Sequence, residues 1–556
     1  MHLIDIFRII LMDDSASEEC EVVVVGGGLA GLTAARTIVR HDASLRVTLV
    51  EANQRLGGRV LSVRSGGRDY DLGAHWVGST QSHMMALVKE FNLGLRPQYL
   101  QGRKVLQVGD MKVRSYDSVL PSLGSWLALL ELGWIINKLE QLARLVNTLD
   151  PVASMAEGEQ LDSESVAGWL TAHARFQSVR DVVAGAVRCT FGAEPAQISV
   201  LLLVTIIKSA GGVSQLFEAT EGTAQEFVVK EGANKIVESL YEEIKEDVKV
   251  LVGEPVTTVE QHKDGAVFVL TAAGRIMKCS RAVICLPPSQ QEKIHFIPGK
   301  SHLVRDQLRL TDTCPGLSPR KQFALQSCQL GLLIKVILQY DRPYWREAGH
   351  SGELVASCPP LCVSFDDSEE DRPALVAFIG GRHAIMWAAR SEKELKAAVV
   401  EQLGECFGDW AYDYTNIIVK NWATHPFIGG SPVSLPSVGS LWVYPALRQT
   451  HHRLHFAGTE TATVWLGYME GAVQSGVRVG LEVLNNIKPQ CLSPSELKVL
   501  NGECSEHVTT VSSAGAAAVR SCSAATRQQV CSALQADDSP PATRSLRGRR
   551  AVEATK

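Results

Sequence analysis

The chain has 556 residues, too many for one ordinary hydrophobic core, and this length predicts two or three domains. Hydrophobic residues make up 45% and charged residues 21% of the chain, as in a soluble globular protein. A formal net charge of -5 excludes a general attraction to nucleic acid or to anionic membranes. The 13 cysteines form no CxxC pair, which argues against a disulfide framework or a metal site and favours a reducing compartment.

The first 11 residues are only weakly apolar, and a clear pattern of strand and helix signals begins at residue 21. Residues 1–11 contain Asp5 and Arg8 and end in no small-residue cleavage site, which argues against a signal peptide. A β-branched run at 21–25 predicts a buried parallel strand. Residues 29–40 have the apolar spacing of a helix, and 46–50 predict a second strand. Together these segments predict one βαβ unit.

A glycine motif joins the first strand to the helix. Gly26, Gly28 and Gly31 fit G-x-G-x-x-G, in which the glycines permit a tight turn, close backbone approach to a pyrophosphate, and close packing of helix on strand. Glu51 lies 20 residues beyond Gly31, where a carboxylate meets ribose hydroxyls. The motif predicts a dinucleotide site but does not distinguish NAD from FAD. A second glycine pair in the segment 55–59 favours a longer, permanently held dinucleotide.

The middle of the chain alternates between helices and strands. We expect helices at 123–145, in pieces over 163–208, and at 392–406, and strands at 248–270 with a turn at 263–265, at 332–340 and at 374–379. The longest apolar run, 198–207, falls short of the roughly 20 residues that span a membrane, so it predicts a buried helix and the chain predicts no membrane span. The segment 489–556, rich in Ser, Ala, Thr and Arg toward its end, predicts a disordered tail.

Three blocks of sequence carry a family resemblance. Residues 22–59 resemble the opening of the flavin-containing amine oxidases, and the block 71–78, DLGAHWVG, resembles their next recurring motif. The stretch 455–463, HFAGTETAT, followed by WLGYMEGA at 465–472, is very similar to the carboxy-terminal motif of animal monoamine oxidases. The resemblance extends with gaps from about residue 21 to residue 484.

The resemblance implies an α/β fold like that of monoamine oxidase. An FAD-binding, Rossmann-like domain with a doubly wound parallel sheet would come from 18–98, 230–300 and 424–488. A substrate domain with a mixed sheet and helices would come from 99–229 and 301–423.

The resemblance also implies which residues hold FAD. Glu51 would bind the adenosine ribose, Arg59 would lie by the pyrophosphate, and Val256 would contact adenine through its backbone. A helix beginning near Met469 would point its positive end at the flavin. The full set of expected FAD contacts is Gly26, Gly28, Leu29, Ala30, Gly31, Glu51, Ala52, Arg59, Gly73, Ala74, His75, Trp76, Val256, Gly458, Glu460, Tyr468, Met469 and Ala472.

Two residues are expected to be catalytic and three to contact the substrate. By resemblance, Lys335 holds a water beside flavin N5 and Tyr468 forms one wall of an aromatic cage around the amine. Phe217 falls near the residue that gates the cavity, Gln225 near a substrate-orienting glutamine, and Pro432 opposite Tyr468. From the residues alone, Tyr468 and Phe217 could equally be core residues, Gln225 a surface residue, and Lys335 a strand-end lysine reaching solvent.

The chain departs from the animal enzymes in three places. Where they carry a Cys-Tyr pair, this chain has Ser431 and Pro432. Ser431 cannot form a thioether, so FAD should be held non-covalently, and Pro432 supplies no aromatic face unless Trp442 or Tyr444 replaces it. The stretch 311–328 is longer than the family's link before Lys335. No carboxy-terminal membrane helix follows, so anchoring in the mitochondrial outer membrane does not carry over.

The expected function is oxidative deamination, in which an amine, water and oxygen give an aldehyde, ammonia and hydrogen peroxide. Monoamines are the favoured substrates, and a cytoplasmic location is expected, with association at the mitochondrial surface and a homodimer left open by analogy. A polyamine oxidase remains an alternative because Glu194, Glu218 and Glu221 would suit an acidic tunnel. An amino-acid oxidase would need an arginine clamp, and a flavin-binding scaffold without turnover is the third alternative.

Overall fold

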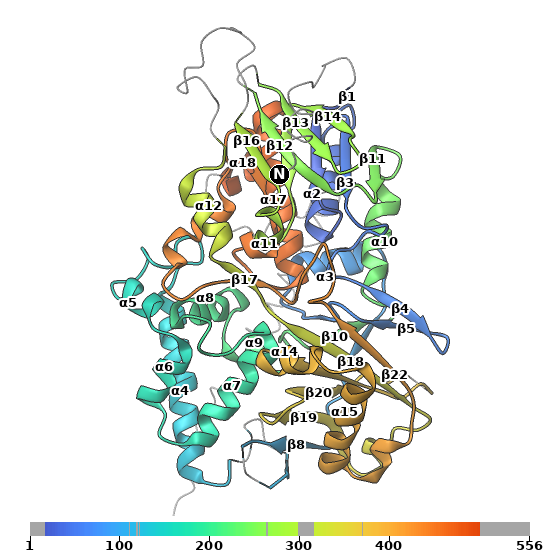
Figure 1. Cartoon of the computed structure of the whole chain (residues 1–556), viewed down its shortest axis with the longest axis vertical. Coiled ribbons are helices and arrows are strands. Elements are labelled where there is room, and N and C mark those ends of the chain that lie inside the picture. The colour runs from blue at the N-terminus through green and yellow to red at the C-terminus, as the bar shows by residue number, and fades with distance from the viewer. Residues whose placement is uncertain are drawn as a thin grey trace, which may run out of the picture. The chain divides into compact units, whose positions relative to one another are not determined.

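A computed structural model describes residues 17–500, except 110–111, 118–120, 122, 263–264, 299–315 and 370. A five-stranded sheet in the order β11-β3-β2-β15-β24 is parallel throughout. It consists of β2 (Val22–Val25), β3 (Val47–Glu51), β11 (Val248–Val252), β15 (Arg281–Ile284) and β24 (Leu454–Phe456). With α2 (Leu29–His41), β2 and β3 form the predicted βαβ unit, which confirms the Rossmann-like fold (Figure 1).

Both faces of this sheet are covered, as its continuous apolar strands require. Successive side chains of a strand point to opposite faces. Val22 and Val24 therefore pack with α2, α10 (Asn234–Ile244) and α17 (Met469–Ile487), whereas Val23 and Val25 pack with a second sheet. That sheet, in the order β1-β14-β13-β12-β16, contains β1 (Glu18–Glu19), β12 (Val256–Gln261), β13 (Val267–Thr271), β14 (Ile276–Cys279) and β16 (His295–Pro298).

Two glycines let α17 lie directly against α2. A Cβ on Gly476 would come within 2.5 Å of the Ala30 carbonyl oxygen, and one on Gly480 within 2.7 Å of the Thr37 Cβ. Both distances are far below van der Waals contact, so any larger residue would push the helices apart. The two helices run in the same direction, and the N-termini of both reach one cavity.

A seven-stranded mixed sheet forms the second large layer, in the order β22-β18-β21-β20-β19-β8-β9. Its strands are β8 (Arg103–Gln107), β9 (Arg114–Tyr116), β18 (Leu333–Tyr340), β19 (His350–Ala356), β20 (Val363–Asp366), β21 (Ala374–Gly380) and β22 (Tyr414–Asn421). Ile334 and Val336 face α15 (Glu392–Phe407), which begins with a capping box at Ser391. Leu333 and Lys335 point to the opposite face, toward the cavity described below.

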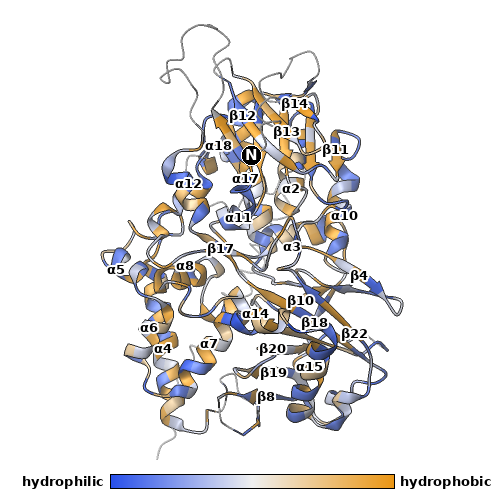
Figure 2. Ribbon diagram, viewed as in Figure 1, coloured by the Kyte–Doolittle hydropathy of each residue, from blue (hydrophilic) through white to orange (hydrophobic). Residues whose placement is uncertain are grey.

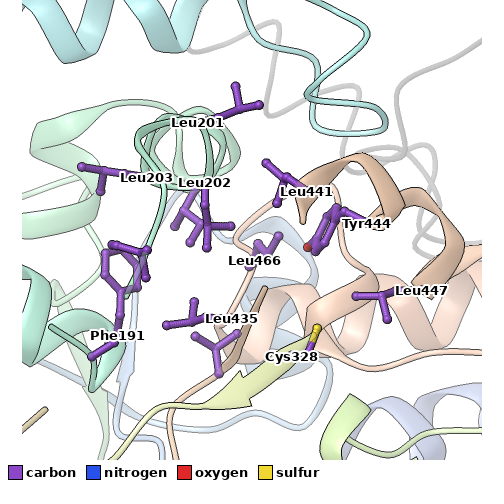
Figure 3. Close-up of a cluster of buried hydrophobic side chains, with 14 of the residues drawn as sticks. Phe191, Leu201, Leu202, Leu203, Cys328, Leu435, Leu441, Tyr444, Leu447 and Leu466 are labelled. Carbon is purple, nitrogen blue, oxygen red and sulfur yellow. The ribbon is translucent and has the colours of Figure 1, made fainter. Parts of the chain in front are cut away.

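Helices between residues 126 and 217 form the third part of the fold: α4 (Trp126–Leu145), α5 (Gly158–Ser163), α6 (Val166–His173), α7 (Gln177–Phe191), α8 (Val200–Ala210) and α9 (Val213–Phe217). The apolar run predicted to be a buried helix is α8, and Ser199 caps it through the Leu202 N–H. Leu202 of α8 packs in one cluster with Phe191, Leu435 and Leu466 (Figure 3). Figure 2 shows that α4, by contrast, carries both hydrophobic and hydrophilic residues around its surface. No helix in the described ranges is long and apolar enough to cross a membrane.

Part of the segment predicted to be a disordered tail is folded. Residues 489–500 form η6 (Pro489–Cys491) and α18 (Pro494–Leu500), and Glu496 of α18 pairs with His41 of α2 at 3.0 Å. The prediction of disorder from residue 489 is therefore wrong up to residue 500, because a local polar composition did not reveal this tertiary contact. Residues 501–556, the turn residues 263 and 264, and residues 311–315 of the long link lie outside the described residues.

The rest of the 311–328 stretch is ordered around a buried lysine. It contains α12 (Pro319–Gln326), whose Lys321 donates to the carbonyl oxygens of Ala446 and Gln449 at 2.7 and 2.9 Å. The remaining short elements are β4 (Ser62–Ser65), β5 (Arg68–Asp71), β6 (Trp76–Val77), α3 (Ser82–Glu90), β7 (Leu95–Pro97), β10 (Phe227–Val229), α11 (Pro288–Gln291), β17 (Cys328–Leu330), α13 (Tyr344–Glu347), α14 (Arg382–Ala388), η3 (Asp409–Tyr412), β23 (Ser434–Pro436), η4 (Leu441–Val443), α16 (Pro445–Arg448) and η5 (Thr459–Thr461).

Candidate active site

One cavity of about 730 Å³ extends from the carboxyl ends of β2 and β3 to the seven-stranded sheet. Its wall includes residues that are hundreds of positions apart in sequence, contributed by both large sheets, by α4 and α7, and by the N-termini of α2 and α17. Ligand sites in open parallel sheets lie beyond the carboxyl ends of the strands, which is where this cavity begins.

The glycine motif forms one end of the cavity. Gly26, Gly28, Leu29 and Ala30 line it, together with Glu51 and Ala52 at the end of β3. The Glu51 carboxylate accepts hydrogen bonds from the Gly27 and Asn53 backbone N–H groups at 2.7 and 2.8 Å, which holds the side chain at the cavity wall. Gly31 does not line the cavity; a Cβ there would lie 1.9 Å from the Gly26 carbonyl oxygen, so its role is close packing of helix on turn.

The N-terminus of α2 fits an anionic diphosphate. Its N-cap, Gly28, has no side chain to bond the first N–H groups of the helix, so these donors remain for a ligand. A Cβ on Gly28 would meet no atom closer than 3.9 Å, which shows open space beside the backbone at this point. Gly57 and Gly58 complete this wall, and Val256 lines it from β12. The free backbone donors and the glycine wall fit the chemistry of a dinucleotide.

Arg59 and Glu460 form a buried pair beside this end of the cavity. The Arg59 guanidinium lies 2.6 Å from the Glu460 carboxylate and donates to the Pro432 carbonyl oxygen at 2.7 Å. Burial disfavours the charged form of Glu460, but the Arg59 charge and a hydrogen bond from the Ser434 N–H outweigh it and hold the pKa of this carboxyl below its usual range.

The Glu460 side chain therefore does not line the cavity, where it was expected to contact FAD. Arg59 lines the cavity, whereas the Glu460 side chain is only 1% exposed and lies behind Arg59. The backbone neighbours Gly458 and Thr459 reach the wall instead. Sequence reasoning could not separate these roles, because it places a residue near a site without showing which way its side chain points.

A second helix N-terminus meets the cavity at Tyr468. Tyr468 is the N-cap of α17, no side chain caps the helix, and Tyr468, Met469 and Ala472 line the wall. Glu470 in the first turn points away and accepts hydrogen bonds from the His83 and Met84 N–H groups of α3 at 3.0 and 2.8 Å. The positive end of the α17 dipole is thus left free to stabilise negative charge in the cavity.

Lys335 projects from the middle of β18 into the cavity and is only 4% exposed. Its ammonium donates to the carbonyl oxygens of Asp71 and Gly73 at 2.9 and 2.7 Å. An ammonium has three donors, so one N–H remains for a molecule in the cavity. Burial lowers the pKa of Lys335 to about 8, while Asp71 and Asp367 oppose this shift. The alternative of a strand-end lysine reaching solvent is wrong.

A charged network that the sequence did not predict lies beside Lys335. The segment Gly73–Trp76 lines the cavity, and the His75 Nδ1 lies 2.9 Å from Asp71. Asp367 lies 3.5 Å from the other ring nitrogen of His75 and also pairs with Arg68 and Arg96 at 2.7 and 3.0 Å. Burial opposes ionisation of Asp367, but these cations, Arg68 foremost, hold its pKa below the usual range.

Aromatic and apolar side chains cover the walls next to Lys335. Phe217, Gln225 and Pro432, the three expected substrate contacts, all line the cavity with Tyr468. The Gln225 amide oxygen is buried and accepts no hydrogen bond, which leaves it for a ligand. Aromatic side chains that the sequence did not single out are Phe191, Phe365, Phe378, Trp422 and Phe427.

Neither aromatic proposed to replace the missing cage ring reaches the cavity. Trp442 is 49% exposed and stacks on Phe323 at 5.8 Å. Tyr444 is buried, and its hydroxyl donates to the Glu460 carbonyl oxygen at 2.8 Å. Pro432 therefore faces the cavity without an aromatic partner from the 442–444 turn.

Three charged residues, Lys104, Glu218 and Glu353, line the part of the cavity near β8 and β19. Of the carboxylates named from the sequence for an acidic tunnel, Glu194 pairs with Arg188 at 2.8 Å outside the cavity wall, and Glu221 is exposed outside it. Within the described residues, Arg59 is the one arginine on the wall, and its pairing with Glu460 leaves no free clamp for a carboxylate substrate.

A dinucleotide cradle that opens into a largely apolar cavity with a buried lysine fits an oxidoreductase that uses a dinucleotide cofactor. The chain belongs to the flavin-containing amine oxidoreductase family, whose model matches residues 29–484. Membership of this family implies FAD as the cofactor and oxidation of amines as the activity.

Individual relatives cover nearly the same region. The chain is 30% identical over 470 residues to a protein described as a probable flavin-containing monoamine oxidase A from Dictyostelium discoideum, covering 84% of this chain and 98% of that protein. A solved structure of putrescine oxidase bound to putrescine matches with a TM-score of 0.76 at 25% identity, covering 84% and 99%. Cyclohexylamine oxidase from Brevibacterium oxydans matches with a TM-score of 0.75 at 26% identity, covering 85% and 100%.

Proposed function

We propose that the protein deaminates primary amines oxidatively, with oxygen as the electron acceptor, to give an aldehyde, ammonia and hydrogen peroxide. FAD, when bound, accepts the two electrons and the hydrogen removed from the carbon next to nitrogen. The observation that carries the proposal is Lys335, a buried ammonium with one N–H left for the cavity, within a largely apolar wall.

The residues around Lys335 suit a neutral amine. The oxidised amine needs its nitrogen lone pair, and a cation held in a dry cavity disfavours a second cation close by. Lys335 therefore favours the neutral amine at this end, while the ring of Tyr468 and the bulk of Pro432 orient the nitrogen. The third Lys335 donor would hold a water or oxygen beside the flavin.

We assign FAD binding to the residues at the other end. The N–H groups at the start of α2 and the Arg59 guanidinium would bind the diphosphate, Glu51 the adenosine ribose, and Val256 the adenine. The segment Gly73–Trp76 and the N-terminus of α17 would hold the flavin, as would the backbone at Gly458.

The domain division follows from the same assignment. We propose that 18–98, 230–300 and 424–488 form the FAD-binding domain, and 99–229 with 301–423 the substrate domain. In support, every strand of the parallel sheet comes from the first set and every strand of the seven-stranded sheet from the second.

We further propose that FAD is held without a covalent bond. Ser431 and Pro432 occupy the place of the linking Cys-Tyr pair. Cysteines 189, 285 and 362 do line the cavity, but burial raises the pKa of the Cys285 thiol to about 12 and that of Cys362 to about 11. A thiol held in its protonated form is a poor nucleophile.

A cytoplasmic location is part of the proposal. The buried cysteines Cys279, Cys285 and Cys328 are free thiols, a state that a reducing compartment maintains. Separation of a cell lysate should leave the protein in the high-speed supernatant, and recovery in a carbonate-resistant pellet would contradict this location.

The function is tested by anaerobic addition of amines to the purified protein. Bleaching of the flavin absorbance, followed by reoxidation with peroxide formation when oxygen is admitted, is the expected result. A yellow protein that no amine bleaches would instead be a flavin-binding scaffold, the alternative without turnover.

A further inference from the structure

A row of four residues on neighbouring strands runs along one wall of the cavity. Lys335 on β18 pairs with Phe378 on β21, Phe378 with Val363 on β20, and Val363 with Val355 on β19. All four residues line the cavity, so this face of the sheet is one of its walls. Neighbouring strands lie about 4.8 Å apart, and the row therefore spans about 14 Å from the Lys335 backbone to the Val355 backbone.

The end of this row opposite Lys335 carries a carboxylate. Glu353 lies two residues before Val355 on β19, and both residues line the cavity. It is only 8% exposed, and its carboxylate lies 3.0 Å from the Lys104 ammonium on β8. Lys104 pairs in turn with Tyr116 of β9, which also lines the cavity.

The charge at this end is not balanced. Glu218, just after α9, lines the same region, so two carboxylates meet one ammonium. Burial raises the pKa of the Glu353 carboxyl, Lys104 opposes this, and the charge of Glu218 adds to it. The walls beside this cluster are apolar and include Leu132, Ile135, Ile136 and Leu139 of α4. A further cation would stabilise the ionised carboxylates in this water-poor environment.

We propose that Glu353, assisted by Glu218, binds a second, protonated amino group of the substrate, so that the protein oxidises one end of a long aliphatic diamine or polyamine. The inference rests on the proposed function, because it takes the Lys335 end as the reaction end. The two ends of the cavity would then bind different charge states of the amino group. Lys335 favours a neutral amine at one end, and the carboxylates bind an alkylammonium at the other. The ordinary pKa of an alkylammonium is about 10.4.

The length of the cavity selects the spacing of the two nitrogens. A hydrogen bond of about 2.9 Å between the distal nitrogen and the carboxylate leaves about 11 Å of the row for the substrate, and an extended chain advances about 1.2 Å per bond. About eight methylene groups therefore fit between the nitrogens. A four-carbon diamine cannot reach both ends at once.

The test compares matched pairs of substrates with the wild-type holoprotein at about pH 7.5, below the pKa of about 8 of Lys335. Anaerobic stopped-flow with 1,8-diaminooctane and octylamine gives the rate of flavin bleaching and the apparent Kd of each. The diamine should bind at least tenfold more tightly, whereas 1,4-diaminobutane should show no such gain over butylamine. Equal or weaker binding of the eight-carbon diamine overturns the subsite. Tight diamine binding, read from the flavin spectrum, without any bleaching supports the subsite and refutes the proposed function.

Three variants separate charge from packing. Glu353→Gln should lower the ratio of diamine to monoamine kcat/KM about tenfold, since loss of one charge-assisted hydrogen bond amounts to about 1.4 kcal/mol. Lys104→Met should raise the same ratio, because it removes the cation that competes for Glu353. The control, Glu401→Gln, changes an exposed carboxylate of α15 outside the cavity and should leave the ratio unchanged. A ratio unchanged in Glu353→Gln, or shifted in the same direction by both cavity variants, overturns the proposal.

Discussion

Replacement of Lys335 by methionine removes the one buried ammonium in the wall near the expected flavin position. Methionine keeps the length and apolar stem of the side chain but loses the two hydrogen bonds to the Asp71 and Gly73 carbonyl oxygens. If the third N–H of Lys335 positions a water or oxygen during turnover, Lys335→Met should slow flavin reduction or reoxidation at least tenfold. That factor equals about 1.4 kcal/mol of barrier, well within the contribution of a hydrogen bond from a charged donor.

The pH dependence follows from the buried charge. The pKa of Lys335 falls from an ordinary 10.5 to about 8, which corresponds to about 3 kcal/mol against the charged form in the folded protein. The unfolded chain binds the extra proton between pH 8 and 10.5, so this penalty is fully present below pH 8 and is relieved as the pH rises through that window. Wild-type thermal stability should therefore rise from pH 8 to 10 relative to Lys335→Met, which has no such titration.

The assay combines kinetics with a matched control. Stopped-flow traces of both half-reactions should show a break near pH 8 in the wild type, and this break should be missing from Lys335→Met while FAD remains bound. Lys420→Met is the control, because Lys420 pairs with Lys335 on the neighbouring strand but lies outside the cavity wall. Unchanged rates for both half-reactions in Lys335→Met, or an equal loss in Lys420→Met, would refute the role assigned to Lys335.

Three further predictions concern the cofactor and the cage. Acid or heat denaturation should release free FAD into the supernatant because Ser431 cannot bond it; flavin that stays with the precipitate would show a covalent link. Tyr468→Ala should slow flavin reduction several-fold without loss of FAD, and Pro432→Tyr should speed it. The two effects should not be additive, because both residues act on the same substrate nitrogen. An unchanged rate of flavin reduction in Tyr468→Ala would make the ring a packing residue. Gly31→Ala should lower the FAD content and the melting temperature, because its Cβ would lie 1.9 Å from the Gly26 carbonyl oxygen, and a fully loaded, equally stable variant would contradict that geometry.

The sequence alone determined the features that depend on neighbours along the chain. The βαβ unit, its glycine motif and Glu51 lie within 30 residues, and strand, turn and helix signals there act on adjacent backbone. The apolar run of α8 and the lysine inside the apolar strand β18 could also be identified locally. Burial of Lys335 could be suspected for the same reason, although its partners Asp71 and Gly73 lie 264 and 262 positions away.

Only the tertiary structure decided which distant groups meet. Asp367 joins Arg68 and His75 although β5 and β20 belong to separate sheets, and no local spacing encodes that contact. Glu353 and Lys104 meet through the register of β19 on β8, which brings together residues 249 positions apart. Glu460 proved to lie behind Arg59, and Trp442 and Tyr444 away from the cavity, because the direction of a side chain depends on the packing of its whole element. The glycine motif and Glu51 at one end of the cavity thus lie in contiguous sequence, whereas the charges around Lys335 and Glu353 arise from strand order and register.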